Sequence, residues 1–398
     1  MIYRPDYIKA IAPFIDKPIV KILAGIRRAG KSTIFEMLRQ ELLRRGVPDV
    51  RIVSRRYTGM EFADLTDRTM YEDIRAAMDG KGRCYLLLDE AQEVEGWERV
   101  VNSLLEGADV DIYVTGSNSR LMSSEISTYL TGRYVSIPVY TLSFKEYLDF
   151  RAGSCLSGNE LLEQYIRFGG FPLVALGDYG ESSAYQIVDG IYHTVISRDI
   201  MKRHHIKRQD LFERVVRFVV ENTGKTFSAN AIAKFLKSER RIVSVESIYN
   251  YLKWLEQAFI IYPCRRYDLQ GKELLKTQEK YYLADISLKY ALLGYNRKML
   301  DGALETIVFF ELKRRGYDVF IGKSDTKEID FVANRRDERI YVQVCVRLPE
   351  GSDREVGNLL MIRDNYPKYV VTLDSMATGN EYGIKVVHLR DFLLSEYW

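Results

Sequence analysis

One eight-residue segment near the amino end places the strongest constraint on how this chain can fold. Residues 25–32 read Gly-Ile-Arg-Arg-Ala-Gly-Lys-Ser and match the pattern GxxxxGK[ST] at every defined position. An apolar run at 19–24 precedes the segment, and a stretch with helical periodicity at 31–45 follows it. In such a turn, backbone N–H groups and the positive end of a helix converge on phosphate oxygens. The segment therefore predicts a phosphate-binding loop in an α/β fold.

Each defined position of this loop has a chemical role. The glycines allow the backbone to approach a phosphate closely. Lys31 would supply a charge for the β- and γ-phosphates, and Ser32 would offer a hydroxyl to Mg²⁺. A plain glycine turn before a helix is the alternative, which the strand–motif–helix context disfavours. The residues predicted to bind the nucleotide are Gly25, Ile26, Arg27, Arg28, Ala29, Gly30, Lys31, Ser32 and Thr33.

A second apolar run, Tyr-Leu-Leu-Leu at 85–88, ends in the acidic residues Asp89 and Glu90. Asp89 would complete the Mg²⁺ shell begun by Ser32, and Glu90 would orient and deprotonate the attacking water. A strand that simply ends in a polar turn is the alternative. Two acids downstream of a phosphate loop favour the functional interpretation, and they favour a hydrolase over a kinase.

Three further residues are candidates for acting on the γ-phosphate. The run 111–116 leads into Ser117 and Asn118, which would lie beside the γ-phosphate or the attacking water, unless they only cap a loop. Arg133 is the best candidate for a charge that senses or stabilises the γ-phosphate, either within the chain or from a neighbouring copy. Two arginines inside the loop itself are weaker alternatives.

The succession of apolar runs predicts four domains. Residues 1–150 alternate strand-like and helix-like stretches, as in the parallel sheet of a P-loop NTPase. Residues 151–205 are typical of a helical lid. Residues 206–300 give three helices and then two strands, the order of a winged helix. Residues 301–398 predict a smaller α/β domain.

Composition excludes several broad classes of protein. Lysine and arginine number 58 against 55 acidic residues, and a net charge of +3 argues against coating nucleic acid by bulk charge. The four cysteines lie far apart without a CxxC pair, so neither a zinc knuckle nor a disulfide framework follows. A signal-peptide pattern is not apparent, and the apolar runs are too short to span a bilayer. A cytoplasmic protein without a membrane partner is expected.

Five segments in this order carry a resemblance to a known group: GIRRAGKST, YLLLDEAQ, VTGSNS, LTGRY and RFGGFP. Over nearly its whole length, the chain resembles the archaeal-type and prokaryotic ATPases that are related to the AAA+ and STAND groups and carry an extra C-terminal domain of unknown function. The resemblance implies ATP with Mg²⁺, the usual roles for Lys31, Asp89 and Glu90, and a sensor at Ser117 or Asn118.

The same resemblance implies a role for the Gly-x-Pro motif. Gly170 and Pro172 would cap the nucleotide and couple it to the winged helix. A helix stop is the plain alternative for this tripeptide.

The two C-terminal domains leave the macromolecular partner open. Basic residues between Lys202 and Arg241 could form a DNA-binding patch, although winged helices in such ATPases also serve as packing lids. The last domain resembles a restriction-endonuclease-like core with Glu305 and Asp330. The next strand has glutamine and cysteine at 343 and 345, where an acid and a lysine are expected. This domain is predicted to be a catalytically inactive binding platform, or an α/β accessory domain with Asp330 at an edge.

The predicted function is that of a Mg²⁺-dependent ATPase whose nucleotide state moves the winged-helix and C-terminal domains. The main alternative is a slowly hydrolysing switch or scaffold that binds a protein or DNA. A metal-dependent nuclease is the third and disfavoured alternative. Arg133 acting on a neighbouring copy would require an oligomer.

Overall fold

A computed structural model describes residues 1–62, 64–122, 130, 132–269, 271, 273–324, 327–348 and 354–398. The chain forms two compact units. The first unit comprises Met1–Thr141 with Gln257–Phe259, and the second comprises Leu142–Glu256 with Ile260–Trp398. The structure of each unit is described by itself. No helix among the described residues is long and apolar enough to cross a membrane.

The first unit contains a five-stranded parallel sheet in the order β2-β3-β4-β1-β5. Strands β1, β3 and β4 are buried along their whole length, as expected of a parallel sheet that helices cover on both faces. All carboxyl ends of the strands therefore lie at one edge. The strands are β1 (Val20–Ala24), β2 (Ile52–Arg56), β3 (Cys84–Asp89), β4 (Val110–Gly116) and β5 (Tyr134–Pro138).

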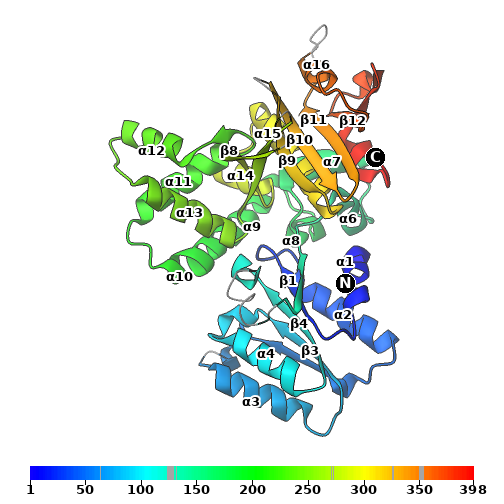
Figure 1. The fold of residues 1–398 in the computed structure, drawn as a ribbon, viewed down its shortest axis with the longest axis vertical. Helices are drawn as coiled ribbons and strands as arrows, with labels where there is room; N and C mark the ends of the chain where they lie inside the picture. The colour runs from blue at the N-terminus through cyan, green and yellow to red at the C-terminus, as the bar shows by residue number, and fades with distance from the viewer. Residues whose placement is uncertain are drawn as a thin grey trace. The chain divides into compact units, whose positions relative to one another are not determined.

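Helices cover both faces of this sheet. Helix α2 lies on one face, and α3 and α4 lie side by side on the other (Figure 1). Thr66 caps α3 through a reciprocal hydrogen-bond pair with Thr69. The strands and crossover helices predicted for residues 1–150 are confirmed to within a few residues. The helices are α1 (Pro5–Ile11), α2 (Lys31–Arg44), α3 (Asp67–Met78) and α4 (Trp97–Gly107).

The second unit contains a nine-stranded mixed sheet in the order β13-β14-β12-β11-β10-β9-β7-β8-β6. Parallel pairs join β7 to β9, β11 to β12 and β12 to β14, and the other pairs are antiparallel. The strands are β6 (Thr226–Phe227), β7 (Ile261–Asp268), β8 (Glu273–Leu283), β9 (Asp318–Ser324), β10 (Lys327–Arg335), β11 (Glu338–Cys345), β12 (Lys368–Thr372), β13 (Gly379–Glu381) and β14 (Ile384–His388).

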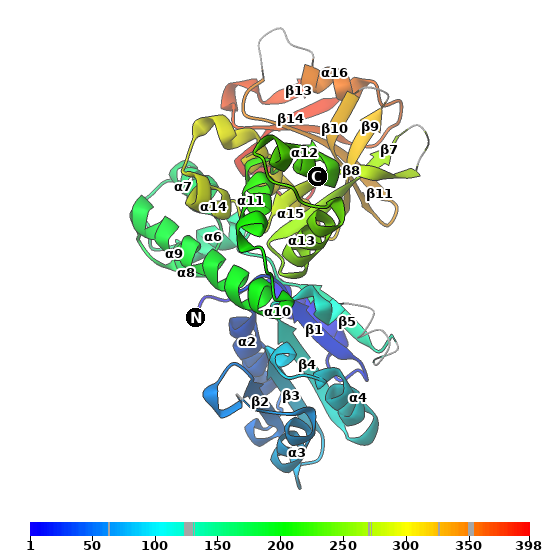
Figure 2. The same cartoon turned by 90° about the vertical axis from the view of Figure 1, so that its left-hand side faces the viewer.

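Thirteen α-helical and π-helical segments among the described residues complete the second unit. Helix α15 is buried nearly all round and packs against β8, β9, β10 and β11 (Figure 2). The segments are α6 (Phe144–Phe150), α7 (Gly158–Phe168), α8 (Pro172–Leu176), α9 (Glu181–Thr194), a π-helix (Val195–Met201), α10 (Lys202–His204), α11 (Gln209–Glu221), α12 (Ala229–Ser238), α13 (Val245–Gln257), α14 (Ser287–Leu293), α15 (Leu300–Arg314), α16 (Arg354–Leu360) and α17 (Leu389–Leu394).

The large sheet crosses the domain boundary that we predicted at residues 300 and 301. Helices α11, α12 and α13 precede the β7–β8 hairpin, in the predicted order. β7 then pairs in parallel with β9 from the last predicted domain. The β7 side of the hairpin is therefore not a free sheet edge. The winged-helix assignment and the four-domain division stay predictions, but the two C-terminal domains share one sheet.

Candidate functional site

The predicted phosphate loop connects the carboxyl end of β1 to α2, and its glycines are required by geometry. A Cβ atom on Gly25 would lie 1.9 Å from the backbone oxygen of Val139. Gly30 directly precedes α2 with a φ of +99°. Helix α2 begins at Lys31, so its unpaired first N–H groups lie at the end of the loop. Residues 25–30 therefore form the backbone cradle that the sequence predicts.

Lys31 folds back over this loop. Its Nζ donates hydrogen bonds to the backbone oxygens of Gly25 at 2.9 Å and Ile26 at 3.2 Å. The same atom lies 3.5 Å from Oε1 of Glu90, and only 3% of the Lys31 side chain is exposed. The ammonium group thus lies between the loop and the end of β3, where a phosphate group would compete for it.

Ser32 and Asp89 meet at the carboxyl edge of the sheet. Ser32 Oγ donates to Asp89 Oδ2 at 2.8 Å, and Thr115 Oγ1 donates to Asp89 Oδ1 at 2.5 Å. Arg56, at the end of β2, donates from Nε to Asp89 Oδ2 at 3.0 Å. A hydroxyl and a carboxylate in contact are the hard oxygen ligands that Mg²⁺ prefers. The residues present therefore fit a magnesium ion. Sequence reasoning missed Thr115 and Arg56.

Glu90 is held in a defined orientation. Its backbone adopts the left-handed conformation with a φ of 56°, and its N–H donates to Thr115 Oγ1 at 3.0 Å. Oε2 of Glu90 accepts hydrogen bonds from Ser117 Oγ at 3.0 Å and from Gln92 Nε2 at 2.5 Å. Burial tends to raise the pKa of Glu90, but the charge of Lys31 and these hydrogen bonds bring the pKa below its ordinary value. Glu90 is therefore an ionised carboxylate.

Two further predicted residues follow β4. Ser117 and Asn118 are fully buried, and Ser117 lies against Glu90. Their role at the γ-phosphate or the attacking water stays a prediction. Gln92 joins the same group, with its Nε2 3.4 Å from Ser117 Oγ. Sequence reasoning missed Gln92, although its position two residues after Glu90 in a tight turn was the available signal.

Arg133 lies at the opposite edge of the sheet from the loop. It directly precedes β5, and its backbone oxygen accepts a hydrogen bond from Val20 at the start of β1. Its guanidinium donates to Asn102 at 2.9 Å and to Glu106 at 2.7 Å. The five residues of β1 separate the two edges by roughly 13 Å or more. The suggestion that Arg133 acts on the γ-phosphate within its own chain is therefore wrong, because β5 runs parallel to β1. A role in a neighbouring copy stays a prediction.

Gly170 and Pro172 belong to the second unit and form a tight connection there. α7 ends at Phe168 and is followed by Gly169, whose φ is +71°, and Pro172 is the first residue of α8. A Cβ on Gly170 would lie 2.5 Å from the backbone oxygen of Leu142, and the Gly170 N–H donates to Asp285 Oδ2 at 2.8 Å. The geometry is that of a helix stop. A nucleotide-capping role stays a prediction.

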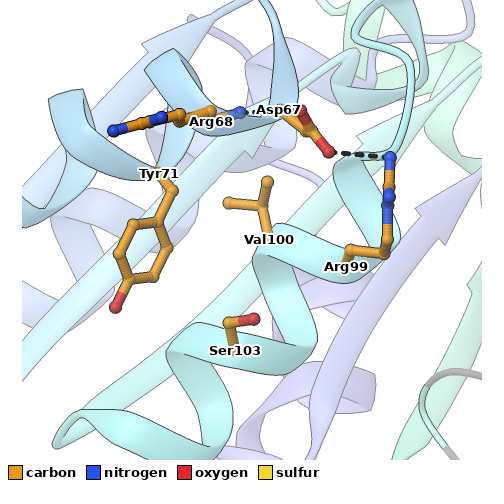
Figure 3. Close-up of a pocket in the computed structure, with 6 residues that line it drawn as sticks. All are labelled: Asp67, Arg68, Tyr71, Arg99, Val100 and Ser103. Carbon is orange, nitrogen blue, oxygen red and sulfur yellow. Dashed lines mark hydrogen bonds and ion pairs between the residues drawn. The ribbon is translucent and has the colours of Figure 1, made fainter.

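A small pocket of the first unit lies between α3 and α4. It has a volume of about 180 Å³, and an ion pair of 2.7 Å joins Asp67 and Arg99 at its side (Figure 3). Ligand sites commonly enclose about 300 Å³ or more. Its lining of Asp67, Arg68, Tyr71, Arg99, Val100 and Ser103 contains none of the predicted site residues. This pocket is not the nucleotide site.

Comparison with known proteins agrees with this geometry. Residues 17–148 match the family model described as an AAA domain, and residues 159–298 match a domain of unknown function. A Haemophilus influenzae protein described as uncharacterized is 37% identical over 398 residues, which cover 99% of both chains. The chain belongs to the same family as this Haemophilus influenzae protein.

More distant similarities also extend over most of the chain. An uncharacterized Methanocaldococcus jannaschii protein, MJ1544, is 28% identical over 351 residues, covering 85% of this chain and 77% of that protein. The solved structure of a Walker-type ATPase from Pyrococcus abyssi superposes with a TM-score of 0.53 at 14% identity, covering 73% of this chain and 96% of that one. Together with the sheet order, the likeness to the Pyrococcus abyssi structure identifies the first unit as a P-loop NTPase fold.

The residues predicted for the last domain also come together. Glu305 of α15 and Asp330 of β10 both contact Lys280 of β8, which the sequence reasoning missed. Gln343 accepts a hydrogen bond from the Asp330 N–H at 3.3 Å. Cys345 is buried, which raises the pKa of its thiol to about 11 and keeps it neutral. Gln343 and Cys345 carry no charge here, and the positive charge beside Glu305 and Asp330 comes from Lys280 on another strand.

Proposed function

We propose that the first unit binds ATP with Mg²⁺ and hydrolyses it, and that the nucleotide state controls the second unit. The observation that carries this proposal is the contact between Ser32 Oγ and Asp89 Oδ2 beside the loop that holds Lys31. A hydroxyl, a carboxylate and an ammonium group converge next to a glycine cradle and a helix amino end. This combination suits a triphosphate and its metal ion.

Binding would change the partners of Lys31. In the structure its ammonium group is bonded to two backbone oxygens and faces Glu90. Phosphate oxygens carry full negative charge, so Lys31 would turn towards the β- and γ-phosphates. The N–H groups of residues 26–33 would bond the same phosphates, and Ser32 and Asp89 would hold Mg²⁺. The metal ion, when bound, would neutralise charge on the phosphate oxygens.

Hydrolysis would depend on the release of Glu90. Its Oε2 is occupied by Gln92 and Ser117, and its Oε1 faces Lys31. Once Lys31 turns to the phosphates, Oε1 is free to accept a proton from water. The water oxygen then attacks the γ-phosphorus, the bond to the β–γ bridging oxygen breaks, and ADP and phosphate form. Nucleotide binding would thus activate the base that consumes the nucleotide.

The positive charge needed at the γ-phosphate has two candidates. Arg56 lies at the same edge as the loop, and 64% of its side chain is exposed. Arg133 could serve only from a neighbouring copy, which would require an oligomer. Arg56 would have to leave Asp89 when Mg²⁺ binds, which would free its guanidinium for a phosphate.

A slowly hydrolysing switch is the second candidate function, and the state of Glu90 favours it. Hydrogen bonds from Gln92 and Ser117 and the nearby ammonium group of Lys31 engage both carboxylate oxygens of Glu90 until Lys31 moves. A protein partner fits this function better than DNA. Arginines of α11 and its neighbours are paired, Arg214 with Glu239 at 2.7 Å and Arg217 with Glu221 at 3.0 Å. These pairs neutralise charge that phosphate binding would need.

ATP turnover, measured together with the mass in solution, tests the proposal. The turnover of the wild-type chain and of Glu90→Gln is measured with and without duplex DNA. The mass of each is measured with and without nucleotide and DNA. The hydrolase predicts turnover that Glu90→Gln abolishes while ATP remains bound. Tight binding with negligible wild-type turnover supports the switch. A chain that does not bind Mg²⁺·ATP contradicts both.

A further inference from the structure

Lys280 forms the centre of a buried ionic cluster in the second unit. Its Nζ lies 2.9 Å from Glu328 Oε1, 3.1 Å from Glu305 Oε2 and 3.4 Å from Asp330 Oδ1. Only 4% of its side chain is exposed. The lysine comes from β8, one acid comes from α15 and two come from β10. One ammonium group therefore joins carboxylates from two other elements.

Other groups hold two of these acids in place. Tyr282 donates from its hydroxyl to Glu305 Oε2 at 2.9 Å, and the Val344 N–H donates to Asp330 Oδ2 at 2.9 Å. The remaining oxygen of Asp330 faces Lys280. Because a carboxylate with a second fixed partner cannot easily turn away, the oxygens around the ammonium group are preorganised.

The charge balance requires a cation at this position. Burial and the neighbouring Asp330 raise the pKa of Glu305 to about 8, and burial also raises the pKa of Asp330. Burial would lower the pKa of Lys280, but the three carboxylates outweigh it and raise that pKa above its ordinary value. Lys280 is therefore charged at neutral pH. Without it, Glu305 and Asp330 would be left as buried acids with no opposite charge beside them.

Converging carboxylate oxygens are also the ligands of divalent cations such as Mn²⁺ and Mg²⁺. Three carboxylates surround one point here, and the three N–H bonds of the ammonium group can serve one acid each. In the described part of the chain, no group of three His, Cys, Asp or Glu residues is placed to hold a metal ion.

We infer that Lys280 is a tethered cation that occupies a divalent-cation site formed by Glu305, Glu328 and Asp330. The second unit then keeps its fold without metal, and removal of the amino group opens the site to Mn²⁺ or Mg²⁺. The same ammonium group fastens the β7–β8 hairpin to α15 and β10. This inference does not depend on ATP hydrolysis by the first unit.

The test is Mn²⁺ binding to the full-length chain without nucleotide, followed by electron paramagnetic resonance of the free ion. The variant Lys280→Met removes the charge and keeps most of the side-chain length. We expect it to bind one more Mn²⁺ per chain than the wild type does. The additional site should disappear in Lys280→Met combined with Asp330→Asn. Any Mn²⁺ bound at Asp89 in the first unit is common to all variants and cancels.

Lys289→Met is the matched control. Lys289 is also 4% exposed and also feels the charge of Glu305, but it makes no ion pair with the described residues. Its removal should add no Mn²⁺ site. A folded Lys280→Met chain with no additional Mn²⁺ overturns the inference, and so does a wild-type site that Asp330→Asn removes.

Folding of the variant provides a second readout. If Lys280→Met is unfolded without metal, the inference predicts that millimolar Mn²⁺ restores its circular dichroism and a cooperative thermal transition. A variant that stays unfolded in Mn²⁺, while Lys289→Met folds, overturns it.

Discussion

The two units each contain a buried lysine beside carboxylates, and the lysines differ in what they bond. Lys31 has 3% of its side chain exposed and Lys280 has 4%. Lys31 donates to two neutral backbone oxygens and lies 3.5 Å from a single carboxylate. Lys280 contacts three carboxylates at 2.9 to 3.4 Å.

This difference determines which lysine can be recruited by a ligand. Lys31 would exchange neutral acceptors for charged phosphate oxygens, so its movement is favourable when a triphosphate binds. Lys280 would leave the buried acids Glu305 and Asp330 without an opposite charge, and breaking such a network is strongly unfavourable. A lysine with acids nearby is therefore not by itself a functional site. The identity of its partners separates a site ready for a ligand from one that is already filled.

The largest effect is expected from Glu90→Gln in the first unit. Glutamine keeps the size of the side chain but cannot accept the proton of water. ATP turnover should fall by about 10²–10⁴-fold, the usual contribution of a general base. Binding of ATP should persist, because Glu90 is not predicted to hold a phosphate. Turnover that survives the substitution, measured as phosphate release, would assign the base to another residue.

Removal of Lys280 should have the largest effect on stability. Lys280→Ala leaves the acids of the cluster unpaired, and we expect a loss of about 3–5 kcal/mol in the free energy of unfolding without added metal. Urea unfolding followed by circular dichroism measures this loss. Lys289→Ala serves as the control and should cost less. Equal losses for the two lysines would remove the distinction between a filled site and an ordinary buried lysine.

The cluster also predicts a pH dependence of stability. The pKa of Glu305 is about 8 in the folded chain, well above the value of about 4.3 expected when it is unfolded. The folded state therefore binds a proton that the unfolded state releases between these values, so stability falls as pH rises from about 4.5 to 8. Lys280 stays charged in both states over this range and adds no slope.

Thermal unfolding from pH 5 to pH 9 measures this dependence. The midpoint of the second unit should fall by several degrees across the range. Glu305→Gln cannot ionise and should flatten the curve. Glu311→Gln, on the same helix and in contact with Arg315 at 2.8 Å, should leave the slope unchanged. A wild-type curve that rises with pH would contradict the assignment.

The smallest effect concerns the two candidate arginines. Arg56→Ala removes an exposed partner of Asp89 at the loop edge, and we expect a several-fold change in the Mg²⁺ concentration needed for turnover. Arg133→Ala should leave the turnover of dilute, monomeric protein unchanged, because Arg133 lies at the other edge. A large loss in Arg133→Ala that grows with protein concentration would instead indicate action in a neighbouring copy.

Much of the first unit follows from its sequence because its determinants are local. The apolar strand, the glycine loop and the start of α2 are contiguous, and Asp89 and Glu90 directly end a strand. Parallel pairing then brings these ends to one edge without any further information. The same rule places Arg133 away from the loop, because a residue that directly precedes a parallel strand lies at the amino edge of the sheet.

The second unit was harder to predict because its key contacts are distant in sequence. Lys280 meets Glu305 and Asp330 only after β8, α15 and β10 have packed, and no spacing in the chain indicates this. Strand β13 was missed because it is three residues long and exposed along its whole length. The β7–β9 pairing joins two predicted domains through a long-range parallel contact, which sequence periodicity does not reveal.

The most direct test of the central claim is the binding of Mg²⁺·ATP to the full-length chain, measured by titration calorimetry. The wild type is compared with Lys31→Met and with Lys280→Arg, which keeps the positive charge beside Glu305, Glu328 and Asp330. We predict that the wild type and Lys280→Arg bind ATP alike and that Lys31→Met loses at least about 100-fold in affinity. Equal affinity in Lys31→Met, or no binding by the wild type, would contradict ATP binding at the loop that holds Lys31.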